Sequence, residues 1–244
     1  MAQPTKLQQF QTELNRKSWF GFDLDDTLHE FRRASSAATN QVIQSISQRH
    51  GTPVQSLKDE YSTILREKTS SAFADGKTSI EYRRERFSTL LERFFLPLDA
   101  AFIEQLLDTY EKTLAESLKL KDGALSLLSM LKKSGKKVAV ITEGPQDAQE
   151  RTVKHLGIAD HIDLLATTNF FGVSKTEGLF PKVLDHLGIS AADMVYVGDN
   201  AARDVVPAEK AGILCIHYNE QARTSFDEFP ARLCALGDIE SMLL

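Results

Sequence analysis

Acidic side chains gather directly after an apolar, strand-like segment near the start of this chain. Asp23, Asp25, Asp26 and Thr27 follow the apolar run at residues 19–22. A buried parallel strand reads as a continuous apolar run, and α/β folds place ligands just past the carboxyl ends of such strands. Carboxylates crowded at one point repel one another unless a cation lies among them. This group therefore predicts a metal-binding site.

Polar groups follow apolar runs at three later places as well. They are Thr142-Glu143-Gly144, then Lys175, then Asp199 with Asp204. A hydroxyl and the free backbone N–H groups beside a glycine suit an anionic oxygen, and a lysine supplies a compensating positive charge. Carboxylates, a hydroxyl and a lysine at one edge of a sheet predict a site for Mg²⁺ and a phosphate group.

The spacing of apolar residues predicts the elements that position these groups. Residues from about 32 to 117 have helical periodicity and no convincing strand, whereas from residue 123 onward helices alternate with short apolar strands. That alternation is typical of βαβ units. We therefore predict an α/β fold, with a Rossmann-like doubly wound parallel sheet as the core (residues 1–30 and 119–244). An all-helical cap domain (residues 31–118) is inserted after the first strand, where it would shield the acidic edge.

The composition limits the class of protein. The 244 residues are 42% hydrophobic and 26% charged, with a net charge of −5, which argues against broad nucleic-acid binding. Two cysteines, Cys215 and Cys234, are too few for a disulfide framework and indicate reduced thiols. No apolar run is long enough to span a bilayer or to form a signal peptide. We expect a cytoplasmic protein without membrane insertion, whose oligomeric state the sequence leaves open.

Four short motifs resemble those of the haloacid dehalogenase (HAD) superfamily of phosphohydrolases. In order they are Asp23-x-Asp25-x-Thr27, Thr142, Lys175 and Gly198-Asp199-x4-Asp204. The helical insertion looks like the C1 cap of that family, and the resemblance covers about residues 18 to 217. A single Asp-x-Asp-x-Thr motif is only moderately specific, but four motifs in order, each at a strand end, are strong.

The resemblance implies a role for each acidic residue. Asp23 would be the nucleophile that forms an aspartyl-phosphate, and Asp25 would be the general acid and then the general base. Mg²⁺ would be held by the Asp23 carboxylate, the Asp25 backbone carbonyl and Asp199, with Asp204 supporting from nearby.

The resemblance also implies a phosphate-binding group. Thr142 and Lys175 would hold the phosphoryl oxygens, with Glu143 and Gly144 beside them. Glu143 stands where relatives often carry asparagine, so we expect its side chain to point away from the phosphate or to engage a cation. Residues 176–178 also depart from the Pro-Asp-Pro segment of many relatives. Neither departure removes a reacting group.

Together these roles predict a Mg²⁺-dependent phosphatase acting on a small organic phosphate monoester. Three alternatives remain. A 2-haloacid dehalogenase would use the same nucleophile without a metal or second acid, so Asp25 and Asp199 argue against it. A sugar phosphomutase would return the phosphoryl group to its substrate. A catalytically silent binding protein would be expected to lack the reacting acids, which are all present here.

The cap decides the substrate, and periodicity alone does not tell which of its side chains face the site. Arg83 and Arg86 share one helix face, which is either solvated or in contact with substrate anions. If aromatic residues of the cap faced the site, an apolar leaving group would be favoured; nucleotides, sugar phosphates and isoprenoid phosphates all remain open. We interpret His29 as a surface or hinge residue, and Asp26 as a turn residue pointing away from the site.

Overall fold

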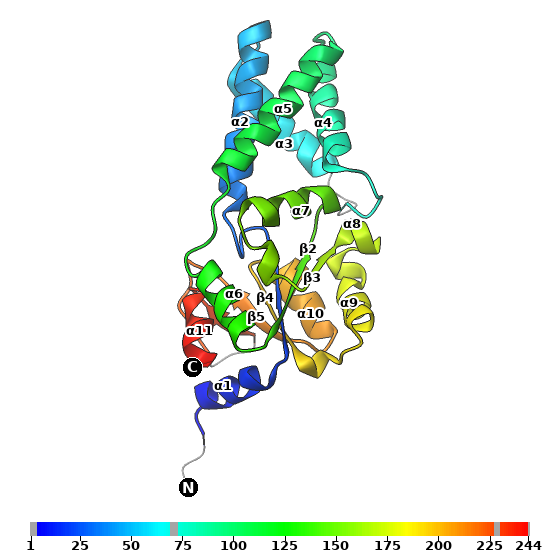
Figure 1. Cartoon of the computed structure of the whole chain (residues 1–244). Coiled ribbons are helices and arrows are strands. Elements are labelled where there is room, and N and C mark those ends of the chain that lie inside the picture. The colour runs from blue at the N-terminus through cyan, green and yellow to red at the C-terminus, as the bar shows by residue number, and fades with distance from the viewer. Residues whose placement is uncertain (1–3, 69–72, 227–229, 244) are drawn as a thin grey trace.

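A parallel β-sheet forms the centre of the molecule, which we describe from a computed structural model covering residues 4–68, 73–226 and 230–243 (Figure 1). Within these residues the strand order is β3-β2-β1-β4-β5-β6, and every neighbouring pair is parallel. The strands are β1 (Trp19–Phe22), β2 (Lys137–Thr142), β3 (Leu164–Thr167), β4 (Met194–Gly198), β5 (Leu214–Tyr218) and β6 (Ala231–Leu233). The order reverses beside β1, so the carboxyl ends of β1, β2 and β4 meet where ligands bind in such folds.

Helices cover both faces of the sheet, because alternate strand residues point to opposite sides. Phe20 and Phe22 pack with α1 (Lys6–Arg16), α6 (Ala124–Lys133) and α11 (Gly237–Leu243). Tyr196 packs on the other face with α9 (Leu179–Leu187) and α10 (Val206–Lys210). Gly21 lies under Tyr196, whose ring would be 2.9 Å from an added Cβ atom. The predicted doubly wound α/β fold is confirmed.

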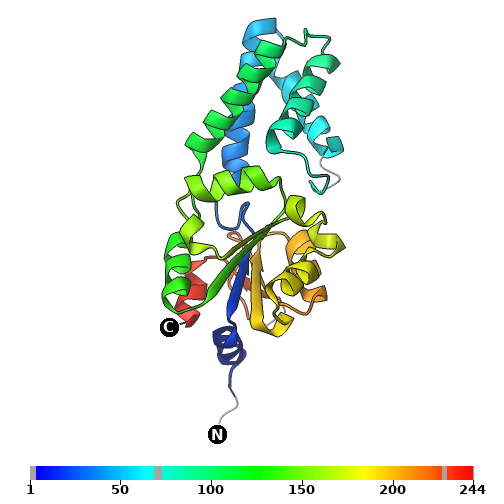
Figure 2. The same ribbon diagram turned by 45° about the vertical axis from the view of Figure 1, so that its right-hand side comes forward.

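Of the five helices described between β1 and β2, the first four have a core of their own and form what we call the cap, whereas α6 packs on the sheet: the cap consists of α2 (Phe31–His50), α3 (Val54–Lys68), α4 (Ser79–Arg93) and α5 (Ala100–Ser117). The cap has its own apolar core, to which all four helices contribute. Its helices fall within the predicted residues 31–118, of which 69–72 lie outside the described part. The cap stands over the carboxyl edge of the sheet, with α7 (Gln146–His155) between them (Figure 2).

The two chain segments that join the cap to the core run side by side and bond to one another. The Glu30 N–H donates to the Lys119 carbonyl, and the Lys121 N–H donates to the Leu28 carbonyl, both at 2.9 Å. His29 lies between these bonds and is fully buried. His29 thus lies where the cap joins the core, the surface position was wrong, and the hinge role stays a prediction.

Two parts of the core differ from the predicted elements. Among the helices expected after residue 123, the one before β5 begins as a π-helical turn (Ala201–Val205) that continues into α10, and neither β6 nor α11 was predicted from the sequence. Both cysteines are free, as expected, and Cys215 is buried in the core. No helix within the described ranges is long and apolar enough to cross a membrane.

Candidate active site

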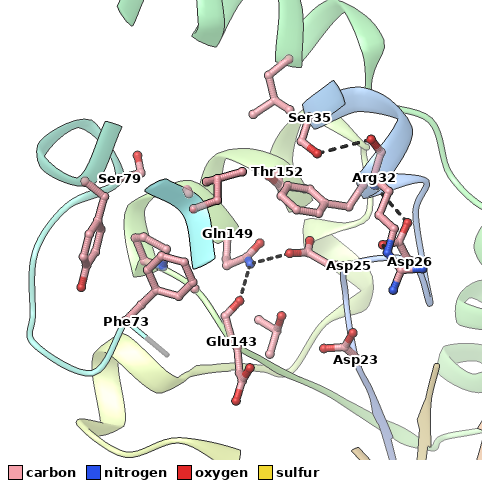
Figure 3. A pocket seen from close by; sticks show the side chains of 18 of the residues that line it. Asp23, Asp25, Asp26, Arg32, Ser35, Phe73, Ser79, Glu143, Gln149 and Thr152 are labelled. Atoms are coloured by element: carbon pink, nitrogen blue, oxygen red, sulfur yellow. Dashed lines mark hydrogen bonds and ion pairs between the residues drawn. The ribbon is translucent and has the colours of Figure 1, made fainter. Parts of the chain in front are cut away.

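The predicted site residues come together at the carboxyl edge of the sheet, beneath the cap. They line one cavity of about 390 Å³, which is within the usual size range of small-ligand sites. Its lining includes all ten predicted residues: Asp23, Asp25, Arg83, Arg86, Thr142, Glu143, Gly144, Lys175, Asp199 and Asp204. Figure 3 shows part of this cavity, with Asp23 and Asp25 on the segment that follows β1.

Lys175 is the centre of the charged group. Its side chain is 3% exposed, and its Nζ donates at 2.6 Å to both Asp23 Oδ1 and Asp204 Oδ1. Asp204 is fixed further by the Tyr196 hydroxyl at 3.0 Å and by the Asn200 N–H at 2.9 Å. These bonds place a buried ammonium directly between two buried carboxylates.

A glycine makes the position of Asp204 possible. A Cβ atom on Gly198 would lie 2.5 Å from the Cβ and Cγ atoms of Asp204, closer than van der Waals contact allows. Both residues of the Gly-Asp pair at the end of β4 therefore contribute to the site: the glycine leaves room for Asp204, and Asp199 lines the cavity.

Burial and charge shift the pKa values of this group in opposite directions. Burial raises the pKa of Asp23 well above its ordinary value, against the effect of Lys175, and the carboxylates of Asp204 and Asp25 raise it further. Burial alone would lower the pKa of Lys175, but its ion pairs with Asp23 and Asp204 outweigh that effect and raise it. Burial and Asp204 also raise the pKa of Asp199. The site thus has an excess of negative charge that one lysine does not balance.

This donor set fits a divalent cation. One carboxylate oxygen from each of Asp23, Asp199 and Asp204 lies within 4.8 Å of the others. Hard cations such as Mg²⁺ prefer carboxylate and carbonyl oxygens, and a second positive charge here would relieve the repulsion that raises the pKa of Asp23.

Asp25 is held in a polar turn beside this group. Its Oδ1 lies 2.9 Å from His29 Nε2, and its Oδ2 accepts a bond of 3.4 Å from the Gln149 amide (Figure 3). Asp26 adopts a φ of 63°, and its carboxylate accepts a bond of 3.0 Å from the Arg32 N–H at the start of α2. Asp26 thus shapes the turn, as predicted, but it also lines the cavity, as Asp25 does, so the expectation that it points away from the site was wrong.

The segment after β2 supplies a free hydroxyl. The Oγ1 atom of Thr142 is buried and has no hydrogen-bond partner among the described residues. Glu143 directs its carboxylate to Arg203, 3.2 Å away, which matches the expectation that it engages a cation. Gly144 has a φ of 147°, and an added Cβ atom would meet the Gln149 amide at 2.6 Å. A buried hydroxyl without a partner is well suited to an incoming anionic oxygen.

Several residues of the site were not found from the sequence. Gln149 bonds to both Asp25 and the Glu143 carbonyl, yet nothing in its helical surroundings distinguishes it from other polar residues. Arg32 links the cap to the core through Asp199 at 3.2 Å, although its side chain is 72% exposed. The spacing of His29, four residues after Asp25, is the one signal that could have suggested its contact.

Comparison with known proteins identifies the family. A sequence profile of the haloacid dehalogenase-like hydrolases matches residues 21–218. The chain belongs to this family. Glyceraldehyde 3-phosphate phosphatase of Pyrococcus abyssi is 26% identical over 200 residues, which are 81% of this chain and 79% of that protein. Pyrimidine 5′-nucleotidase of Escherichia coli is 26% identical over 212 residues, which are 83% and 88%.

Solved structures show the same fold. A HAD hydrolase of Bacillus subtilis bound to magnesium superposes with a TM-score of 0.71 at 22% identity, covering 93% of this chain and 99% of that one. A 2-haloacid dehalogenase of Pseudomonas syringae gives a TM-score of 0.69 at 24% identity, covering 93% and 98%. The predictions of the family, of a hydrolase and of a helical insertion typical of a C1 cap are confirmed.

Proposed function

We propose that this protein is a Mg²⁺-dependent phosphatase that hydrolyses a small phosphorylated metabolite through an aspartyl-phosphate on Asp23. One observation carries the proposal: the buried Lys175 ammonium lies between Asp23 and Asp204, with a third carboxylate, Asp199, near enough to share a cation. A cluster of acids on the surface would not need a buried lysine among them. A site that must accept a phosphate dianion needs such a positive charge.

The residues of the chain supply the two chemical steps. A carboxylate oxygen of Asp23 attacks phosphorus, the bond from phosphorus to the ester oxygen breaks, and Asp25 gives its proton to the departing alkoxide. Asp25, now a carboxylate, then takes a proton from water as the water oxygen attacks phosphorus. Inorganic phosphate leaves, and the carboxylate of Asp23 is restored.

Other groups hold the transferring phosphoryl group. Lys175 and the free hydroxyl of Thr142 would bind its oxygens, and the hydrogen bond from Gln149 would orient Asp25. Asp23, Asp199 and the Asp25 backbone carbonyl would hold Mg²⁺, with Asp204 behind them. The cation would supply further neutralisation of the negative charge that develops on the phosphoryl oxygens. The names of the curated relatives, which include a sugar-phosphate phosphatase and a nucleotidase, support the reaction class.

Phosphate release from a broad panel of phosphate esters, with Mg²⁺ and with EDTA, tests the proposal. We expect Mg²⁺-dependent release by the wild type, none by Asp23→Asn, and retained activity in Asp26→Asn. The last variant is a matched control, because asparagine tolerates the positive φ found at Asp26. Halide release from 2-chloropropionate without metal would instead indicate a dehalogenase, and conversion of a sugar phosphate to its isomer would indicate a phosphomutase.

A further inference from the structure

The cap side of the cavity contains a cationic group that forms no ion pair with any of the described residues. Arg86, on α4, lines the cavity, and its Nε and Nη2 atoms are both buried without a hydrogen-bond partner among the described residues. Its guanidinium lies over the rings of Phe73 and Tyr82, at 5.7 and 5.9 Å from their centroids. Arg86 is half-buried as a whole, but these two N–H donors are shielded from water, and a shielded donor without a partner is costly.

The neighbouring arginines of α4 have acidic partners. Arg83 is buried and pairs with Glu111, and its Nη1 also donates to the Ser79 hydroxyl at 3.2 Å. Arg84 pairs with Glu104 and is absent from the lining of the cavity. The charge of Arg83 is thus balanced within the protein. Of these three arginines of α4, Arg86 is the one that can bind an anion from solution.

The two free atoms of Arg86 are those that bind oxyanions best. Nε and Nη2 lie on the same edge of the planar guanidinium, so their N–H groups form a fork that matches the two oxygens of a carboxylate or phosphate. The cation–π contacts with Phe73 and Tyr82 leave both of these N–H groups without a hydrogen-bond partner among the described residues. No carboxylate among the described residues bonds to these two atoms, so the complementary anion would be supplied by the substrate.

We propose that Arg86 binds a second oxyanion of the substrate, so that the leaving group of the phosphate ester carries a carboxylate or a second phosphate. This inference rests on the proposed phosphatase function. The cap end of the cavity is completed by Tyr61, Tyr110, Leu65 and Leu114, which suit a carbon framework between the two anionic ends. An uncharged apolar leaving group, such as a prenyl chain, would leave the Arg86 fork buried and unpaired.

Matched compounds separate binding from turnover. The probes are ω-carboxyalkyl phosphonates of increasing length, n-alkyl phosphonates of equal length, and α,ω-bisphosphonates. Their carbon–phosphorus bonds are not hydrolysed, so calorimetry with the Mg²⁺-loaded wild type measures affinity alone. The corresponding phosphate esters measure turnover. The variants are Arg86→Gln, Arg86→Lys, and Arg84→Gln as a control from the same helix.

We expect the best-fitting doubly charged phosphonate to bind the wild type about 10- to 100-fold more tightly than its alkyl counterpart, as a charge-assisted bidentate pair would give. Arg86→Gln should abolish that preference, Arg86→Lys should retain part of it, and Arg84→Gln should keep it. A preference for the ω-carboxyalkyl phosphonates would indicate a carboxylate on the substrate, and a preference for the bisphosphonates would indicate a second phosphate.

Two results would overturn the inference. One is equal affinity of the wild type for charged and plain phosphonates. The other is an Arg86→Gln variant that weakens both classes alike, which would indicate that Arg86 only supports Phe73 and Tyr82. Tight phosphonate binding without any release of phosphate from the esters would instead count against the proposed phosphatase function and leave the binding inference standing.

Discussion

Replacing Lys175 by methionine should destabilise the fold far more than loss of an exposed lysine. The side chains of Lys175, Asp23 and Asp204 are 3%, 10% and 2% exposed, so water cannot replace the missing ammonium. Breaking a buried ion pair from one side costs about 3–5 kcal/mol, out of a total stability of about 5–15 kcal/mol. At neutral pH we therefore expect Lys175→Met to lose at least about 3 kcal/mol of its free energy of unfolding.

The loss should shrink as the pH falls. Burial already raises the pKa of Asp23 above its unfolded value, and the variant lacks the ammonium that opposes this rise. A carboxyl whose pKa is higher in the folded state binds more protons there. Stability therefore falls as pH rises from the unfolded pKa to the folded one, and it recovers as pH falls through that window. Mg²⁺ should also recover part of the loss at neutral pH.

Urea unfolding at pH 7 and pH 5, in EDTA and again with Mg²⁺, measures these effects. Lys182→Met is the control, because Lys182 is exposed and its Nζ donates a hydrogen bond to the carbonyl of Phe171. A Lys175→Met protein within about 1 kcal/mol of the control at pH 7 would refute the reasoning. So would a penalty that stays the same at pH 5.

Three further changes test other parts of the site. Gly198→Ala should push Asp204 from its place, costing about 1–3 kcal/mol in urea unfolding and weakening Mg²⁺ binding measured by calorimetry. His29→Leu should lower kcat about tenfold or more with little change in KM, because Asp25 loses the partner that orients it. Asp147→Ala removes two hydrogen bonds from the N-terminus of α4 and should speed hydrogen exchange there. Despite its burial, the pKa of Asp147 is lowered by those bonds, so in the wild type the protection of this region, corrected for the intrinsic exchange rate, should be lost only in acid, as the pH falls through that lowered pKa.

The position of the acids, the threonine and the lysine could be predicted because chain direction alone decides it. Each follows an apolar run, and in a parallel sheet the carboxyl ends of all strands lie on one edge. Asp23, Asp199 and Lys175 therefore meet whatever the details of packing are. The inserted cap could be predicted as well, because a single strand is followed by a long stretch with helical periodicity alone.

Side-chain pairing could not be predicted from periodicity. Arg83 and Arg86 share a helix face, yet the first pairs with Glu111 from α5, whereas the second lies over aromatic rings and pairs with no acid among the described residues. Which of them keeps a free charge depends on how the four cap helices pack. The same holds for the aromatic residues of the cap: Phe87 is in its core, while Phe95 is 96% exposed.

Local turns also escaped prediction. His29 is polar and follows a loop, which favoured a surface position, but the pairing of the two hinge segments buries it. The π-helical turn before α10 arises where Asn200 accepts two bonds through its side chain and Asp204 must reach Lys175. Such geometry depends on contacts between distant parts of the chain, which a local pattern does not contain.

The central claim is that Asp23 carries the phosphoryl group during turnover. Acid quenching of the Mg²⁺-loaded enzyme with its best ester, followed by peptide mapping by mass spectrometry, tests it directly. We predict one phosphoryl group on the peptide that contains Asp23, located at that residue and absent in Asp23→Asn. Sustained release of phosphate with no phosphorylated enzyme, or with the Asp23→Asn variant still active, would contradict the account.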